Sequence, residues 1–318
     1  MHDALAAPPP GGVSASVQLT NHLLEGANIA SGEGEAGQLA SSPLLSGASG
    51  RLWIAPDGRL RIELQAERGD TQILYDGKTL EAYDAATNTL YRYAVPQHEG
   101  AASDQGSDSD RHQPPSVAEI EKAIERLSEH ANVSGAKPDD VAGRPAYTVR
   151  VSPKEAGSLL GGAELSWDAV SGVPLRAAVY SSNSSAPVLE LAVKDISYSA
   201  VDSSIFDFKP PDNAKVHQIE GPHEGESANG GQASGEHPKV TVHGRGVSAI
   251  AVVQGKDEGG QGSQGAPEGL PKVKIGDTSA SELATSLGTV LTFARSGVRY
   301  LLVGSVPASA IEAVARGL

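Results

Sequence analysis

The chain has 318 residues, of which 39% are hydrophobic and 4% aromatic, and its formal net charge at pH 7 is −14. This length allows one large domain and a small one. The negative charge excludes nucleic-acid binding through a basic surface and argues against docking on anionic lipid by net charge alone. The absence of cysteine excludes disulfides, thiolate metal sites and a cysteine nucleophile.

The N-terminal stretch, residues 1–11, is polar and Pro-rich, and we expect it to be disordered. It lacks the basic start and the apolar run of a signal peptide. Because Met1 leads directly into this polar stretch, we expect an export signal or anchor to be absent from this chain. No apolar run reaches the length of a membrane span.

Alternating apolar and polar residues predict one antiparallel sheet over residues 12–219. In residues 58–65, Leu60, Ile62 and Leu64 alternate with charged residues, which is the period of a strand with one buried face. Asp76-Gly77 is a hairpin signal, because glycine supplies the positive φ of a tight turn. The same alternation predicts further strands at 13–24, 51–56, 71–76, 79–84, 89–95, 146–153, 163–169, 173–182 and 187–199.

Capping patterns predict a few helices. Ser116 with Glu119 forms a capping box, and Val117, Ile120, Ile124 and Leu127 then fall on one face, so residues 116–130 are predicted to be an amphipathic helix. The patterns Ser152 with Glu155 and Ser279 with Glu282 predict two more helices. A last helix is expected after Pro307.

Three segments are too polar and Gly-rich to bury much apolar surface, and we expect them to be disordered: an insertion at 97–115, a linker at 220–238 and a loop at 254–270. The linker is the expected domain boundary. Beyond it, residues 239–318 predict a small β-β-β-α domain, in which Ser296-Gly297 is a hairpin turn.

Two stretches together resemble a known family. They are GRLRIELQ (58–65), followed by TQILYDGKTLEAYDAATNTLYRYAVP (71–96), and a second half that ends in IFDFKPPDNAKV (205–216). Over residues 13–217 the chain resembles the outer-membrane lipoprotein carriers (LolA-like) and the RseB-like envelope proteins, most closely their actinobacterial branch. The C-terminal unit resembles a small bacterial envelope domain of unknown function. The resemblance implies an unclosed, strongly curved β-barrel with a helical lid.

The resemblance also implies a ligand site on the concave apolar face. Our candidates for contact with a lipid are Leu60, Ile62, Leu64, Leu74, Tyr75, Tyr83, Leu165, Leu189 and Leu191. The candidate lid residues are Val117, Ile120, Ile124 and Leu127, and the candidate gating residue is Arg61. Each also fits an ordinary role: the apolar residues as core, the helix as plain cover for the sheet, and Arg61 as part of a solvent-facing row.

We expect no enzyme, catalytic residue, metal or cofactor, because the sequence lacks the motifs that carry them. The first functional hypothesis is an extracytoplasmic, monomeric carrier of a lipid or of a lipoprotein acyl chain. The second is an envelope-stress sensor or anti-sigma-factor regulator with a membrane-anchored partner, which predicts an exposed apolar patch on the small domain or between the domains. The third is a structural interaction module without a ligand.

Overall fold

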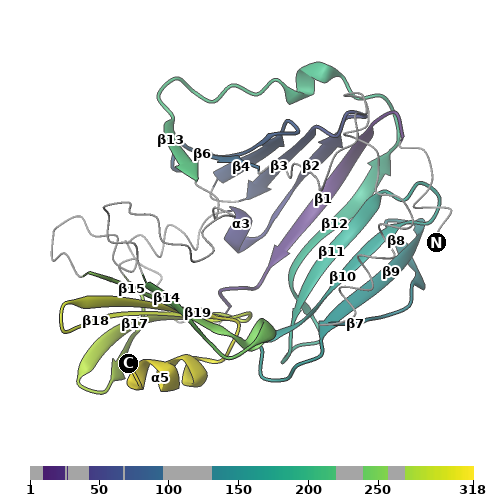
Figure 1. The fold of residues 1–318 in the computed structure, drawn as a ribbon. Helices are drawn as coiled ribbons and strands as arrows, with labels where there is room; N and C mark the ends of the chain where they lie inside the picture. The colour runs from purple at the N-terminus through teal and green to yellow at the C-terminus, as the bar shows by residue number, and fades with distance from the viewer. Residues whose placement is uncertain are drawn as a thin grey trace, which may run out of the picture.

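The computed structural model describes residues 10–25, 27, 43–66, 69–95, 131–219, 239–256 and 269–318. In these residues the chain forms two β-sheets that meet at one side of the molecule (Figure 1). The larger sheet is strongly curved and open, and the smaller one lies below its open side. The expected helix at 116–130, the insertion at 97–115, the linker at 220–238 and most of the N-terminal stretch lie outside the described residues.

The larger sheet has 13 strands, in the order β13-β6-β5-β4-β3-β2-β1-β12-β11-β10-β9-β7, and β8 also pairs with β9. All its pairs are antiparallel except β13 with β6. The strands are β1 (Val13–Asn21), β2 (Ala48–Ile54), β3 (Leu60–Ala66), β4 (Gly69–Tyr75), β5 (Thr79–Asp84), β6 (Thr89–Ala94), β7 (Ala131–Val133), β8 (Lys137–Val141), β9 (Arg144–Pro153), β10 (Leu160–Asp168), β11 (Pro174–Ser181), β12 (Pro187–Ser197) and β13 (Lys215–Ile219).

The register assigns every residue of this sheet to one of two faces, because paired residues share a face and successive residues alternate. One face contains Val17, which is paired with Gly50 on β2 and with Val193 on β12. The short helix α3 (Pro43–Ser46) packs on this face through Leu44. Figure 1 shows α3 inside the curve of the sheet, so this face is the concave one.

The convex face of β3 to β6 is covered by the segment 199–214, which includes the 3₁₀ helix η1 (Ser203–Phe206). The ring of Phe208 lies 5.5 Å from that of Tyr83, and Arg59 stacks on Phe206 at 4.9 Å. Arg61 donates a hydrogen bond to the carbonyl oxygen of Ile205 at 2.5 Å. The segment therefore fastens β13, which follows it, to the edge strand β6.

The smaller sheet has six strands in the order β14-β15-β19-β18-β17-β16. One of its faces packs against α5 (Ala308–Arg316), and their shared core includes Val252, Leu291, Leu302 and Ile311, all fully buried. The strands are β14 (Lys239–His243), β15 (Ile250–Lys256), β16 (Lys272–Ile275), β17 (Thr278–Ala284), β18 (Thr289–Arg295) and β19 (Val298–Gly304), with the 3₁₀ helix η2 (Gly246–Ser248) before β15.

The predicted fold class is confirmed: the described chain is mainly β, the large sheet is antiparallel and unclosed, and the small unit ends in the expected helix. Two predicted helices are wrong. Ser152 and Pro153 end β9, and a series of bends leads from there to β10. Ser279 and Glu282 lie within β17, which pairs on both sides and so satisfies its backbone in the sheet.

Candidate functional site

The concave face of the large sheet is apolar over most of its width. From β9 across to β3, the described residues that the register places on this face include no charged side chain. At the β9 edge, Asp140 on β8 is paired with Pro145 and is the charged residue there. Toward the opposite edge, the first charges on this face are Asp84 and Lys215, on β5 and β13. Such a face has the composition of a protein core but belongs to an open sheet.

Part of this face is filled by the protein itself. Val17, Leu52, Leu64, Leu175 and Val193 are buried in one cluster. On both sides of the cluster the apolar side chains are only half-buried or exposed, and Leu165 is 44% exposed. We call these flanking residues the concave surface: Leu60, Ile62, Ile73, Tyr75, Leu80 and Tyr91 on β3–β6, and Val149, Val151, Leu165, Ala177, Val179, Leu189 and Leu191 on β9–β12.

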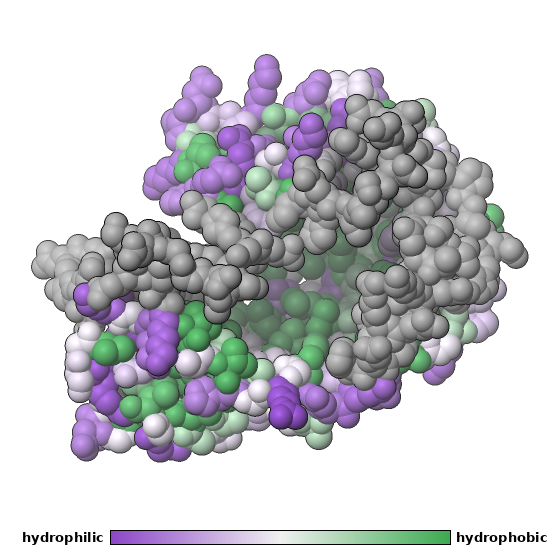
Figure 2. All heavy atoms as spheres, viewed as in Figure 1, coloured by the Kyte–Doolittle hydropathy of each residue, from purple (hydrophilic) through white to green (hydrophobic). Residues whose placement is uncertain are grey.

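The space-filling view shows a hollow between the two sheets whose visible floor is hydrophobic (Figure 2). Exposed apolar side chains scattered singly on a surface are ordinary, but a contiguous patch inside a hollow marks a binding surface. The concave surface is therefore the candidate functional site of this protein.

The structure brings seven of the nine predicted ligand-contact residues to one face. Leu60, Ile62, Tyr75, Leu165, Leu189 and Leu191 belong to the concave surface, and Leu64 is in the filled cluster beside them. The other two, Leu74 and Tyr83, point to the convex face, where both are buried and Tyr83 lies beside Phe208. They are not part of the candidate site.

Arg61, the predicted gating residue, also lies on the convex face, paired across β3 and β4 with Leu74. Besides Ile205, it bonds Glu63 at 2.5 Å and Gln72 at 2.8 Å. In the described residues its contacts are therefore with the covering segment and its own sheet, on the side away from the hollow.

The sequence analysis omitted seven members of the concave surface: Ile73, Leu80, Tyr91, Val149, Val151, Ala177 and Val179. The signal that would have found them is the period of two. Once Tyr75 is assigned to the hollow, Ile73 must point the same way, and Leu80 opposite Tyr75 must follow.

The charged residues of β9–β12 form a network on the convex face. Arg176 donates to Glu190 at 2.8 Å and to Glu164 at 3.0 Å, and the hydroxyl of Tyr180 donates to Glu164 at 2.6 Å. Burial would raise the pKa of Glu164, but the bonds from Tyr180, Arg176 and Arg150 hold that pKa below its usual value. All of these charges lie on the convex parity of their strands, so none of them is part of the inner face.

One end of β10 is anchored by a buried carboxylate, Asp168. It accepts bonds from the backbone N–H groups of Val170 and Ser171, each at 2.8 Å, from the Tyr198 hydroxyl at 2.9 Å, and from Arg144. Burial acts to raise the pKa of Asp168, but these four donors outweigh it and hold that pKa far below its ordinary value. The anchor ties the start of β9 to the β10–β11 turn.

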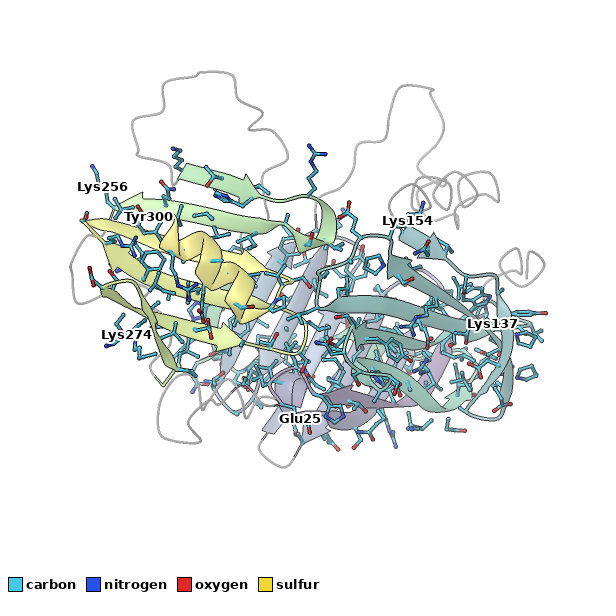
Figure 3. All side chains as sticks on the ribbon, turned by 90° about the horizontal axis from the view of Figure 1, so that it is seen from below. Glu25, Lys137, Lys154, Lys256, Lys274 and Tyr300 are labelled. Atoms are coloured by element: carbon cyan, nitrogen blue, oxygen red, sulfur yellow. The ribbon has the colours of Figure 1, made fainter. Side chains whose placement is uncertain are left out.

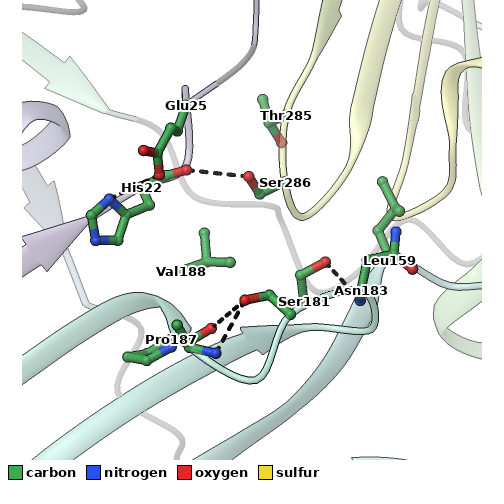
Figure 4. Close-up of a pocket in the computed structure, with 11 residues that line it drawn as sticks. His22, Glu25, Leu159, Ser181, Asn183, Pro187, Val188, Thr285 and Ser286 are labelled. Atoms are coloured by element: carbon green, nitrogen blue, oxygen red, sulfur yellow. Dashed lines mark hydrogen bonds and ion pairs between the residues drawn. The ribbon is translucent and has the colours of Figure 1, made fainter.

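The two sheets meet through small polar contacts. Ser286 donates to the carbonyl oxygens of Leu23 and His22 at 3.1 and 3.2 Å, and the Leu159 N–H donates to Ser305 at 2.7 Å. A cavity of about 430 Å³ lies between these contacts, with Asn183 among its lining residues (Figure 4). The walls combine apolar side chains such as Leu159 and Val188 with hydroxyl groups, an amide and the His22–Glu25 pair, so this cavity differs in chemistry from the concave surface.

Two further features of the described residues bear on function. No helix among them is long and apolar enough to cross a membrane. Within the same residues, no group of three or more histidines, aspartates or glutamates is placed to hold a metal ion.

No protein-family model matches the chain, and no curated protein matches it. Solved structures are similar. The MucA/MucB complex of Pseudomonas aeruginosa matches over 96% of this chain and 91% of that chain, with 17% identity and a TM-score of 0.46. A crystal structure of MucB matches over 98% and 93%, with 15% identity and a TM-score of 0.41. A LolA superfamily protein of Nitrosomonas europaea matches over 63% and 90%, with 9% identity and a TM-score of 0.22.

These are LolA-like and RseB-like proteins, as the sequence resemblance indicated, although they do not indicate an actinobacterial branch. Because the TM-scores are below 0.5, the functional proposal rests on the residues of this chain.

Proposed function

We propose that the protein binds the acyl chain of a lipid or of an acylated protein on its concave surface, without catalysing a reaction. The observation that carries this proposal is the uncharged apolar face from β9 to β3, half-exposed on both sides of a filled centre. A monomeric chain that binds acyl groups outside the cytoplasm fits this surface and the sequence resemblance.

The apolar contact alone can supply the affinity. Each methylene that leaves water contributes about 0.8 kcal/mol, so a chain with about twelve buried methylenes gains on the order of 10 kcal/mol before entropic losses. Half-exposed aliphatic side chains such as Leu165, Val149 and Leu189 offer this contact without directed polar bonds. The protein would therefore recognise the ligand by its hydrocarbon chain and not by one functional group.

We propose that the functional parts of the chain are the domains predicted from its sequence. Residues 12–219 form the ligand-binding domain, residues 239–318 form the small domain, and residues 220–238 connect them. Limited proteolysis followed by mass spectrometry of the fragments tests these boundaries, which would be wrong if cleavage fell within β10–β12.

The alternative function is an envelope sensor or anti-sigma-factor regulator. It predicted an exposed apolar patch on the small domain, and Val240, Val242, Leu301 and Val303 form such a patch. We rank this function second for two reasons. A ligand that lies in the hollow would also contact this patch, so the ligand-binding function accounts for both surfaces. A regulator without a ligand gives the concave surface no role.

The first test is native mass spectrometry of the purified protein together with organic extraction. Co-purifying acyl lipid, or saturable binding of a fluorescent fatty acid by ligand-free protein, is the expected result. A protein that is purified without lipid and does not bind the added fatty acid would show that the proposal is wrong.

A matched pair of variants localises the binding. Leu165→Gln places an amide on the concave surface, where contact with an acyl chain would leave it without a hydrogen-bond partner at a cost of about 1–3 kcal/mol. The expected loss of fatty-acid affinity is therefore roughly 5-fold to 150-fold. The control, Val170→Gln, changes an equally apolar side chain, 71% exposed, in the β10–β11 turn. Equal effects of the two variants would contradict a site on the concave surface.

A further inference from the structure

Two cavities adjoin where the two sheets meet. The cavity described above has a volume of about 430 Å³, and a second cavity of about 500 Å³ shares Leu159 and Asn183 with it. Seen from below in Figure 3, Glu25, which lines the first cavity, lies at the boundary between the small sheet and the large one. The residues that line the two cavities include none of the concave surface. Volumes of this size are typical of small-molecule sites, so the two cavities are a second candidate site.

The walls of both cavities disfavour a charged ligand. Glu25 lines the first cavity and Glu155 the second, and no lysine or arginine is among the described residues that line either of them. Like charges therefore oppose the entry of an anion. The carboxylate of Glu25 already contacts the imidazole of His22, with 3.1 Å between Oε2 and Nδ1, so a cation would have to compete with this partner.

The first cavity has an apolar floor and a polar rim. Val188 is buried and Leu159 half-buried, whereas His22, Glu25 and Asn183 are exposed. Figure 4 shows Val188 between the His22–Glu25 pair and Asn183. A hydrocarbon chain would take the polar groups of the rim out of water without bonding them, which is unfavourable. A ligand that fits both parts has an apolar face and hydroxyl groups around its edge, as the ring of a sugar has.

Two side chains at the rim have hydrogen-bonding groups to spare. Asn183 donates its backbone N–H to Ser181 at 3.3 Å, and its side-chain amide has no hydrogen-bond partner in the part of the chain that the structure describes. Glu25 uses one carboxylate oxygen for His22, so its other oxygen can accept. An amide both donates and accepts, and a carboxylate accepts. This combination suits sugar hydroxyl groups, because each hydroxyl is a donor and an acceptor.

The site takes its walls from both sheets. Thr285 and Ser286, in the turn between β17 and β18, line the first cavity opposite residues of the large sheet, and Pro307 lines the second. Ser286 also donates to the carbonyl oxygen of His22 at 3.2 Å. A ligand in the first cavity would therefore contact both sheets beside one of the bonds that join them.

We propose that the two adjoining cavities bind a carbohydrate, with the uncharged rings of a short glycan against Val188 and Leu159 and their hydroxyl groups toward Asn183 and Glu25. The walls disfavour the other classes of small ligand, because anions find no cation here and hydrocarbon chains desolvate the rim. The site is separate from the concave surface, so the inference goes beyond the proposed function and does not rest on it.

The test is saturation-transfer difference NMR of the full chain with glucose, N-acetylglucosamine and the disaccharide of N-acetylglucosamine. Ligands of this size with ordinary efficiency bind with a Kd of about 1 mM, which this method detects. The disaccharide should bind most tightly, because the cavities adjoin. Glucose 6-phosphate should bind more weakly than glucose, because its phosphate faces carboxylates without a cation.

A matched pair of variants localises the binding. Asn183→Leu removes the free amide and should weaken binding of the neutral sugars roughly fivefold or more. The control, Asn213→Leu, changes an exposed asparagine of the segment 199–214, where the backbone carbonyl and not the side chain accepts from Asn88. The control should bind sugars like the wild type, and equal melting temperatures show that both variants fold.

Methyl and octyl glucoside, the latter below its micelle concentration, distinguish a free glycan from the sugar of a glycolipid. Equal affinity assigns the site to a free glycan. An octyl glucoside that binds more tightly and is displaced by fatty acid assigns it to a glycolipid, and Asn183→Leu should weaken binding in either case.

Three results would overturn the inference. The first is the absence of saturation transfer to all three neutral sugars, which would leave the cavities to water. The second is an equal effect of Asn183→Leu and its control. The third is binding of glucosamine more than about tenfold tighter than glucose, which would identify a site for amines. None of these results bears on fatty-acid binding by the concave surface, so the proposed function is tested separately.

Discussion

Replacing the buried carboxylate Asp168 tests whether its four hydrogen bonds hold the end of the sheet. In Asp168→Asn one amide oxygen can still accept from Val170 and Ser171, but an NH₂ group then faces two donors, Arg144 and Tyr198. Losing two charge-assisted bonds and leaving Arg144 without its partner is expected to cost about 3 kcal/mol. The melting temperature should fall by roughly 6–12 °C.

The effect of pH follows from the direction of the pKa shift. The folded-state pKa of Asp168 is lowered, so the carboxylate stabilises the fold at neutral pH, and that contribution is lost as the pH falls from the unfolded value of about 3.9 toward the folded one. Thermal or urea unfolding at pH 7 and at pH 3.5 should show a smaller difference between wild type and variant at the lower pH.

The exposed Asp139 on the neighbouring strand β8 provides the control, since Asp139→Asn should change stability by less than about 0.5 kcal/mol. The reasoning would be refuted if Asp168→Asn behaved like this control, or if its deficit were the same at both pH values.

Two further changes test the packing. Gly50→Ala should destabilise the protein by more than about 2 kcal/mol in urea unfolding, because a Cβ at this position would lie 1.8 Å from the carbonyl oxygen of Glu63, whereas Gly135→Ala, with nothing within 4 Å, should be neutral. Glu282→Gln should raise the urea midpoint at pH 7–8, because burial and the charge of Glu312 raise the pKa of Glu282 and so make its ionised form unfavourable in the folded protein. This gain should disappear as the pH falls toward 4, where Glu282 is protonated in both states, and a gain independent of pH would contradict it.

The strands of the large sheet were largely predictable, because alternation is strong wherever one face is buried. The strands missed by the sequence analysis are short or polar, such as β8, whose residues Lys137–Val141 include two aspartates. Their pairing depends on a neighbour distant in sequence. The same holds for β17, where the local capping pattern of Ser279 and Glu282 is overridden by hydrogen bonds to β16 and β18.

The candidate site was less predictable than the strands, because its lining depends on which of the two faces of the sheet each residue points to. Leu74 and Tyr75 are adjacent, so they must point to opposite faces, and only the register shows that Tyr75 is the one in the hollow.

The order of strands has a consequence for synthesis of the chain. The N-terminal meander β1–β6 has two outer edges, and their partners come late: β12 (Pro187–Ser197) pairs with β1, and β13 (Lys215–Ile219) pairs with β6. During synthesis both edges stay unpaired until these residues emerge, although the meander between them can already form. Unpaired edges of an apolar sheet are templates for aggregation. We therefore expect truncations that end before residue 187 to be insoluble.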